Sequence, residues 1–203
     1  MKKLIKYKDW ILAIFILSIF FLYLDKKIVL ILKETTFYCK EFEVFKEIFG
    51  KIVETFHKIF LFLLIMFSLY LYFFKNKKLG KSLILSMIIA GMLCQIKFLI
   101  GRARPKITYD TLLFVGPNLT YNYASFPSGH VFFLFFMSKI LSSEYPKWKG
   151  FFYGLAILVA LQRVLVFAHF PSDVIGGAFL GYKLGEFLHK KLFKAQISEK
   201  YRF

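Results

Sequence analysis

The stretch that decides the fold is IFLFLLIMFSLYLYFF, residues 59–74, which runs for 16 residues without a charged side chain. A helix needs about 20 predominantly apolar residues to cross the hydrocarbon core of a bilayer, with a lower limit near 17. Lys58 and Lys75 bound the stretch, and lysines at helix ends can extend their ammonium groups to the membrane interface. The sequence therefore predicts a membrane-spanning helix over residues 58–75.

Working outward, five further stretches fit the same criterion if lysines lie at their ends or a functional charge lies inside. The fold class predicted is an all-α integral membrane protein, a bundle of six transmembrane helices in one domain, residues 1–203. The predicted spans are residues 9–25, 58–75, 81–100, 126–142, 150–168 and 173–189.

Residues 25–58 are too polar to span a membrane, with seven lysines against six acidic residues. Apolar residues nevertheless recur there at helical spacing. Two interpretations stay open: an amphipathic helix along the outer interface between spans one and two, or a solvated helical hairpin. The apolar positions are Phe42, Phe45, Phe49, Ile52, Val53 and Phe56.

The charge balance allows two classes of protein. The chain has 203 residues, 58% of them hydrophobic, and a formal net charge of +17. A basic chain is typical of nucleic-acid binders, but also of membrane proteins with positive cytoplasmic flanks. Here the four segments on the side of the N-terminus hold 17 basic and four acidic residues. This bias predicts that both termini are cytoplasmic, and it disfavours a nucleic-acid partner.

Three polar clusters lie at the outer ends of the predicted spans. Ionisable residues at membrane depth are costly and usually functional, so the clusters predict one site at the outer face. They are Lys97 with Gly101-Arg102-Ala103-Arg104-Pro105, then Ser125-Phe126-Pro127-Ser128-Gly129-His130, then the segment from Arg163 through His169 to Asp173.

Within the three clusters, the cations Lys97, Arg104 and Arg163 are accompanied by one acidic residue, Asp173. Burying cations together is unfavourable unless an anion joins them. Arginine forks and a lysine point charge suit a phosphate. Pro127-Ser128-Gly129-His130 opens the fourth span, where free backbone N–H groups, the Ser128 hydroxyl and the small Gly129 favour an anion. The clusters therefore predict a phosphate site.

Two histidines add the chemistry. His169 and Asp173 are four residues apart, so Asp173 can accept from one imidazole nitrogen and leave the other as a nucleophile. His130 can then protonate the departing oxygen as a general acid. Because the cations supply charge stabilisation, we expect no metal and no other cofactor. His57 and His189 lie near helix ends without a partner motif, and we interpret them as packed or interfacial residues.

The combined pattern Lys97-x6-Arg104-Pro105, Pro127-Ser128-Gly129-His130 and Arg163-x5-His169-x3-Asp173 resembles the three-part signature of the type-2 phosphatidic acid phosphatase family. These membrane lipid phosphatases share a phosphate site with vanadate haloperoxidases. The resemblance implies phosphate binding by the residues Lys97, Arg104, Ser128, Gly129 and Arg163. It also implies His169 as nucleophile, Asp173 as its orienting partner and His130 as general acid.

One position departs from the family pattern, because Gln162 precedes Arg163 where the family usually has Ser. Gln162 keeps a hydrogen-bond donor, so we expect altered support of the site and an active enzyme. Arg102 and Lys106 flank the first motif and either contact anionic headgroups or anchor the interface.

The expected activity is dephosphorylation of a membrane lipid at the outer, periplasmic face of a bacterial inner membrane. Lipid A 1-phosphate is slightly favoured because Arg102 and Lys106 add cations; phosphatidylglycerophosphate, phosphatidic acid and undecaprenyl pyrophosphate are the alternatives. The rival from another class is a non-catalytic lipid-phosphate binding or transport protein. A soluble haloperoxidase is excluded by the six predicted spans.

Overall fold

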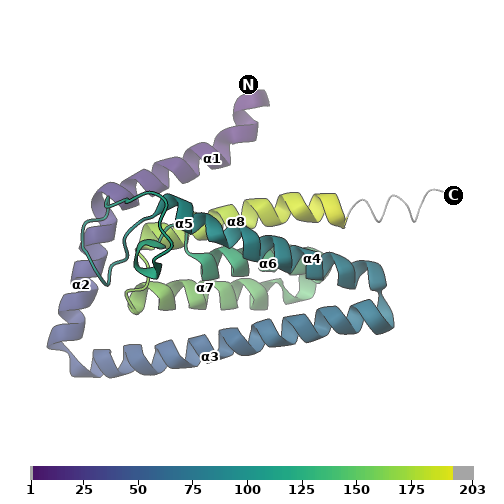
Figure 1. The fold of residues 1–203 in the computed structure, drawn as a ribbon, viewed down its shortest axis with the longest axis horizontal. Helices are drawn as coiled ribbons and strands as arrows, with labels where there is room; N and C mark the ends of the chain where they lie inside the picture. Colours follow the sequence, from purple (N-terminus) through teal and green to yellow (C-terminus); the bar gives the residue numbers. More distant parts are fainter. Residues whose placement is uncertain (1, 194–203) are drawn as a thin grey trace.

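The computed structural model describes residues 2–193, and most of them are helical (Figure 1). The all-α prediction is confirmed for this part of the chain, where the sole strand-like feature is an isolated antiparallel bridge between Arg102 and Phe114. The predicted cytoplasmic tail beyond residue 193 lies outside the described residues. The helices are α1 (Lys2–Ile19), α2 (Asp25–Tyr38), α3 (Lys40–Tyr70), α4 (Lys77–Leu93), α5 (Lys97–Ile100), α6 (Gly129–Glu144), α7 (Lys149–Leu165) and α8 (Pro171–Leu192), joined in places by short π or 3-10 turns.

Helix α6 is the centre of the bundle, since it packs on α4, α7 and α8, while α3 packs on α4 and α7. Figure 1 shows these helices running along the long axis, with α2 crossing them at one end. The contact of α6 with α8 is especially close. A Cβ placed on Gly177, Gly181 or Gly185 would press against the α6 backbone, so these small residues allow the two helices to approach each other.

Local sequence fixes several helix ends. Asn76 begins α4 by accepting a hydrogen bond from the Leu79 N–H at 3.0 Å, a standard N-cap. Pro171 occupies the first turn of α8, where its missing N–H costs nothing. Gly101 ends α5 with a φ of +67°, in the left-handed region that favours glycine. The chain then enters the irregular loop of residues 101–125.

Among the described residues, three helical segments are long and apolar enough to cross a membrane: Lys40–Lys75, Lys77–Ile100 and Pro146–Leu165. They overlap the predicted spans 58–75, 81–100 and 150–168. Less than a third of each apolar window is buried inside the protein, which leaves wide hydrophobic faces of the kind that lipid covers. The other three predicted spans correspond to helices α1, α6 and α8, whose crossing of a membrane stays a prediction.

Residues 42–56 do not form a helix separate from the second predicted span. They are the first half of α3, which continues for 31 residues without a break. The separate short helix in this region is α2 instead. The charged residues before residue 58 predicted that the membrane-spanning helix begins there. A helix can pass from a polar segment into an apolar one without losing its backbone hydrogen bonds, and α3 does so.

Candidate active site

The three motifs meet at one end of the bundle, and hydrogen bonds through the backbone join them. The Ser125 N–H donates to the Arg102 carbonyl at 3.0 Å, and the Ser128 N–H donates to the Asp173 carbonyl at 3.0 Å. The Arg104 guanidinium donates to the Ala168 carbonyl at 3.0 Å. The loop of residues 101–125, the start of α6 and the start of α8 therefore form one structural unit.

His169 is buried in this unit with one ring nitrogen facing Asp173. Its Nδ1 lies 3.7 Å from Asp173 Oδ2 and 3.4 Å from Ser125 Oγ. The distance to Asp173 is longer than a hydrogen bond, and such contacts often tighten when substrate binds. Burial lowers the pKa of the His169 imidazole below its ordinary value, with Asp173 opposing. Protonation of Nδ1, the nitrogen that faces Asp173, would leave the lone pair on Nε2.

Asp173 is held by donors on three sides. Ser125 Oγ and Arg102 Nη1 each donate to its carboxylate at 2.5 Å, and the Phe170 N–H donates at 2.8 Å. The last of these bonds belongs to the N-terminal cap of α8, so the start of that helix also fixes the carboxylate. The sequence predicted the His169–Asp173 pairing but not Ser125.

Arg102 differs from its prediction as a headgroup contact, because its side chain is fully buried. Besides Asp173, it donates to Asp25 Oδ2 at 2.8 Å and twice to the Thr111 carbonyl. Asp25, also fully buried, accepts from the Ser172 N–H at 2.9 Å and from the Ser172 hydroxyl. The buried carboxylates of Asp25 and Asp173 are stabilised by a cation between them, and this explains why the Arg102 side chain points into the protein. Lys106 is exposed at the surface.

Several donors at the site lack a partner. Within residues 2–193, the buried Arg163 Nε and Ser128 Oγ have no hydrogen-bond partner, and the half-buried Lys97 ammonium has no hydrogen bond or ion pair, only a cation–π contact with Phe98 at 5.1 Å. A Cβ on Gly129 would lie 3.5 Å from Lys97 Nζ, so the ammonium lies beside the first turn of α6. Buried donors without partners are rare in proteins, so Arg163 and Ser128, with the nearby charge of Lys97, favour an anion.

Arg104 is held differently. Its Nε donates to the Tyr121 carbonyl at 2.9 Å, and its Nη2 donates to the Ala124 carbonyl at 3.0 Å. The guanidinium carbon lies 3.7 Å from the centre of the Tyr121 ring, a cation–π contact. Carbonyls thus satisfy most of the Arg104 N–H groups. Arg104 therefore holds the loop of residues 101–125 in place, and it contributes positive charge to the site but few free N–H groups.

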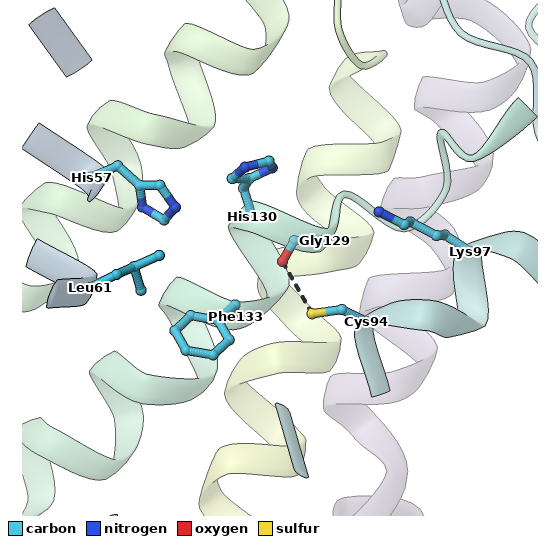
Figure 2. Close-up of a pocket in the computed structure, with 7 residues that line it drawn as sticks. All are labelled: His57, Leu61, Cys94, Lys97, Gly129, His130 and Phe133. Carbon is cyan, nitrogen blue, oxygen red and sulfur yellow. Dashed lines mark hydrogen bonds between the residues drawn. The ribbon is translucent and has the colours of Figure 1, made fainter. Parts of the chain in front are cut away.

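Two cavities adjoin the unpaired donors. The first, of about 210 Å³, is lined by Lys97, Gly129 and His130 together with His57. Figure 2 shows the rings of His57 on α3 and His130 on α6 next to each other, and they form an edge-to-face contact with ring centres 5.2 Å apart. The second, of about 520 Å³, is lined by Arg163 and exposed charged residues, including Lys106. Phosphate-binding candidates therefore face both cavities.

His57 is packed inside the bundle against His130, one of the two alternatives predicted, but it lies within α3 instead of near a helix end and also lines the first cavity. His189 does lie away from the site, with its Nε2 2.7 Å from Glu144 Oε1. Gln162 is buried, and its amide donates to the Gly50 carbonyl of α3 at 3.4 Å. The side-chain amide of Gln162 therefore links α7 to α3. In residues 2–193, no three His, Cys, Asp or Glu side chains cluster in a way that could hold a metal ion.

The model of the PAP2 superfamily matches residues 79–197, which contain all three motifs and more than half of the chain. The chain belongs to the PAP2 superfamily. The resemblance seen in the sequence is thereby confirmed; the residues of the three motifs all lie within the matched region, whereas His57 and Asp25 lie outside it.

Similar members of the PAP2 superfamily include two lipid A 1-phosphatases. Those of Rhizobium johnstonii and Rhizobium etli are both 34% identical over 106 residues, 51% of this chain and 43% and 46% of theirs. The undecaprenyl-diphosphatase of Sulfolobus acidocaldarius is 34% identical over 117 residues, 56% of this chain and 55% of that protein. The chain therefore spans about half the length of the curated relatives it matches.

Among solved structures, the crystal structure of Aquifex aeolicus LpxE resembles this fold with a TM-score of 0.52 and 29% identity. The match covers 72% of this chain and 84% of that one. The helical arrangement that positions the PAP2 site is thus shared with a solved structure.

Proposed function

We propose that this protein is a phosphatase that removes a phosphate from a membrane lipid, through a phosphohistidine intermediate and without a metal ion. The observation that carries the proposal is a pair of buried donors without a partner, Arg163 Nε and Ser128 Oγ, whose backbones are hydrogen-bonded to the segment that holds the buried His169. A bound phosphate satisfies these donors, and the free Nε2 of His169 supplies the nucleophile.

The chemistry proceeds in two balanced steps. His169 Nε2 attacks phosphorus, the bond between phosphorus and the lipid oxygen breaks, and His130 gives its proton to that oxygen. Water then attacks the phosphohistidine, giving its proton to His130, and phosphate leaves as the P–N bond breaks. Lys97, Arg104 and Arg163 stabilise the negative charge that develops on the phosphoryl oxygens. Asp173 stabilises the positive charge on the His169 ring.

An apolar groove favours a lipid over a soluble phosphate ester. Leu61 and Phe133 line both the cavity beside His130 and a second hollow of about 410 Å³. That hollow lies between α3 and α4, and its remaining lining residues are all hydrophobic, including Ile84 and Ile88. A hydrocarbon chain in this groove would place its phosphate end at His130.

The proposed membrane arrangement keeps six spans, with α1, α6 and α8 crossing in addition to the three longer segments. Both termini are then cytoplasmic and the site faces the periplasm of a bacterial inner membrane. The names of the relatives support lipid A 1-phosphate and undecaprenyl diphosphate as candidates. Burial of Arg102 removes half of the reason for favouring lipid A; exposed Lys106, on the second cavity, remains a candidate headgroup contact.

The test is phosphate release by the full chain, purified in detergent and given candidate lipids in the presence of a chelator. We expect release by the wild-type protein and at least a thousandfold loss in His169→Ala, since the nucleophile is gone. Release by His169→Ala at the wild-type rate would rule out the phosphohistidine. Binding of lipid phosphate without any release would favour the non-catalytic rival, and activity that needs added metal would refute the metal-free mechanism.

A further inference from the structure

We propose that Asp25 is a positioning residue of the reaction, which acts by neutralising the charge of Arg102. Asp173 then keeps its own negative charge for the ring of His169. This inference rests on the proposed phosphatase function, in which Asp173 stabilises the positive ring that forms at the nucleophile. It assigns a role in turnover to a residue that lies outside the three motifs and outside the region matched by the family model.

The local structure places Asp25 beside the loop that carries Arg102. A short π-turn, Phe20–Leu24, separates α1 from α2, and Asp25 follows it as the first residue of α2. Turns of this kind are rare and frequently lie at functional sites. The Phe21 carbonyl within the turn accepts a hydrogen bond from the Thr111 hydroxyl at 3.0 Å, which ties the turn to the loop. The Asp25 side chain is fully buried at this junction.

The contacts of Asp25 are those of an ionised carboxylate. Its Oδ1 accepts from the Ser172 N–H at 2.9 Å, and its Oδ2 accepts from Arg102 Nη2 at 2.8 Å and from the Ser172 hydroxyl. The oxygen of that hydroxyl accepts in turn from Arg102 Nη1 at 2.6 Å, so its proton is free to point at Asp25. Both carboxylate oxygens therefore act as acceptors, a role that suits the ionised form.

A count of charges shows what Asp25 adds. Arg102 Nη1 donates to Asp173 Oδ1 at 2.5 Å, while Asp173 Oδ2 faces the His169 ring. The pair of Arg102 and Asp173 alone would sum to zero. With the second carboxylate, that of Asp25, the cluster has a net charge of −1. Asp25 thus allows Arg102 to hold the carboxylate in place without cancelling the charge that the nucleophile needs.

Aromatic rings enclose this charge cluster. The Arg102 guanidinium carbon lies 4.2 Å from the centre of the Phe21 ring and 4.5 Å from the centre of the Phe170 ring. All three charged side chains of the cluster are fully buried. Charges interact more strongly in such surroundings than in water. A change of one charge in the cluster therefore alters the electrostatic potential at the nucleophile.

The experiment measures kcat and KM of Asp25→Asn in detergent, with whichever of the four candidate lipids the wild type cleaves fastest. Asn has the shape of Asp but no charge, and the remaining pair of Arg102 and Asp173 is balanced, so we expect a folded protein. We expect kcat to fall by about tenfold or more and KM to change by less than about threefold, because the side chain bonds to Arg102 and Ser172.

The matched control is Asp9→Asn. Asp9 also pairs α1 with α8, through Lys183, but at an exposed site. Its removal tests whether loosening the contact between these two helices is enough to lower activity. We expect kcat of Asp9→Asn to equal that of the wild type.

A purely structural role would lower activity without moving its pH dependence. Loss of the Asp25 charge makes the cluster less negative, so His169 should release its proton more readily. The acid limb of kcat/KM should therefore move to lower pH. The other charged or titratable groups that act on His169 are Arg104, Arg163 and His130, and Asp25→Asn leaves them in place. An acid limb that does not move would overturn the charge balance.

The double variant of Arg102→Met and Asp25→Asn separates charge from structure. It leaves Asp173 as the one charge of the cluster, so the net charge returns to that of the wild type. The double variant should therefore be more active than Asp25→Asn, whereas two independent structural losses would multiply. If Asp25→Asn does not fold, Arg102→Met takes its place in the comparison, because the double variant also removes its second uncompensated carboxylate.

The outcomes distinguish this inference from the proposed function. A double variant no more active than the single one would overturn the role of Asp25 and leave the phosphatase intact. So would a kcat of Asp25→Asn within about twofold of wild type. A wild type that releases no phosphate from any of the four lipids overturns the proposed function itself.

Discussion

Replacing Arg102 with Met removes a cation that touches two fully buried carboxylates, Asp25 at 2.8 Å and Asp173 at 2.5 Å. Methionine fills much of the same volume but leaves both carboxylates without their cation. Removing one partner of a buried pair costs about 3–5 kcal/mol. Since 1 kcal/mol shifts the Tm of a chain this long by roughly 2–4 °C, the expected fall is about 6–20 °C.

Thermal unfolding in detergent, followed by intrinsic fluorescence, measures this fall. Lys106→Met removes an exposed cation of the same loop and should shift Tm by less than about 2 °C, because surface charges contribute little. Adding Asp25→Asn to Arg102→Met should recover part of the lost stability, since one orphaned charge is neutralised. A Tm of Arg102→Met within 2 °C of wild type would refute the buried charge balance.

Three further perturbations follow from the packing and the site. Gly181→Ala should destabilise the protein by about 1–3 kcal/mol, because its Cβ would overlap the Phe132 backbone, whereas Gly154→Ala, with open space around it, should not; unfolding curves of both variants check this. Burial lowers the pKa of His169 in the folded protein, so as the pH falls below about 6.5 the unfolded chain binds a proton at this residue before the folded chain does. The free energy of unfolding therefore decreases as the pH falls. His169→Asn should make that fall shallower by at most about 1.4 kcal/mol per pH unit, and an unchanged slope between pH 7 and 5 would contradict it. Ile88→Trp fills the apolar groove and should lower kcat/KM for long-chain lipids but not for a short-chain soluble phosphate monoester; equal effects on both would exclude the groove as the lipid path.

The helices and the motif residues were predictable because their signals are local. Apolar runs mark the helices, and His169 and Asp173 are only four residues apart, on either side of the start of α8. The continuity of α3 was missed because the prediction relied on the local composition, which changes from charged to apolar near residue 58 while the backbone stays helical.

The remaining features depend on partners far along the chain. Arg102 meets Asp25 across 77 residues, and nothing beside Arg102 in the sequence separates a buried arginine from a surface one. His57 acquires its place through α6, which brings His130 to it. The close contact of α8 with α6 likewise requires both helices, although the spacing of Gly177, Gly181 and Gly185 is visible in the sequence.

The two cavities have a consequence for turnover under the proposed function. Lys97 lines the first cavity, which adjoins the apolar groove. Arg163 lines the second cavity together with exposed charged residues. The dephosphorylated lipid can slide back sideways into the bilayer while inorganic phosphate departs separately into water. The lipid product and the phosphate then leave by separate routes, so that neither blocks the other before the next substrate binds.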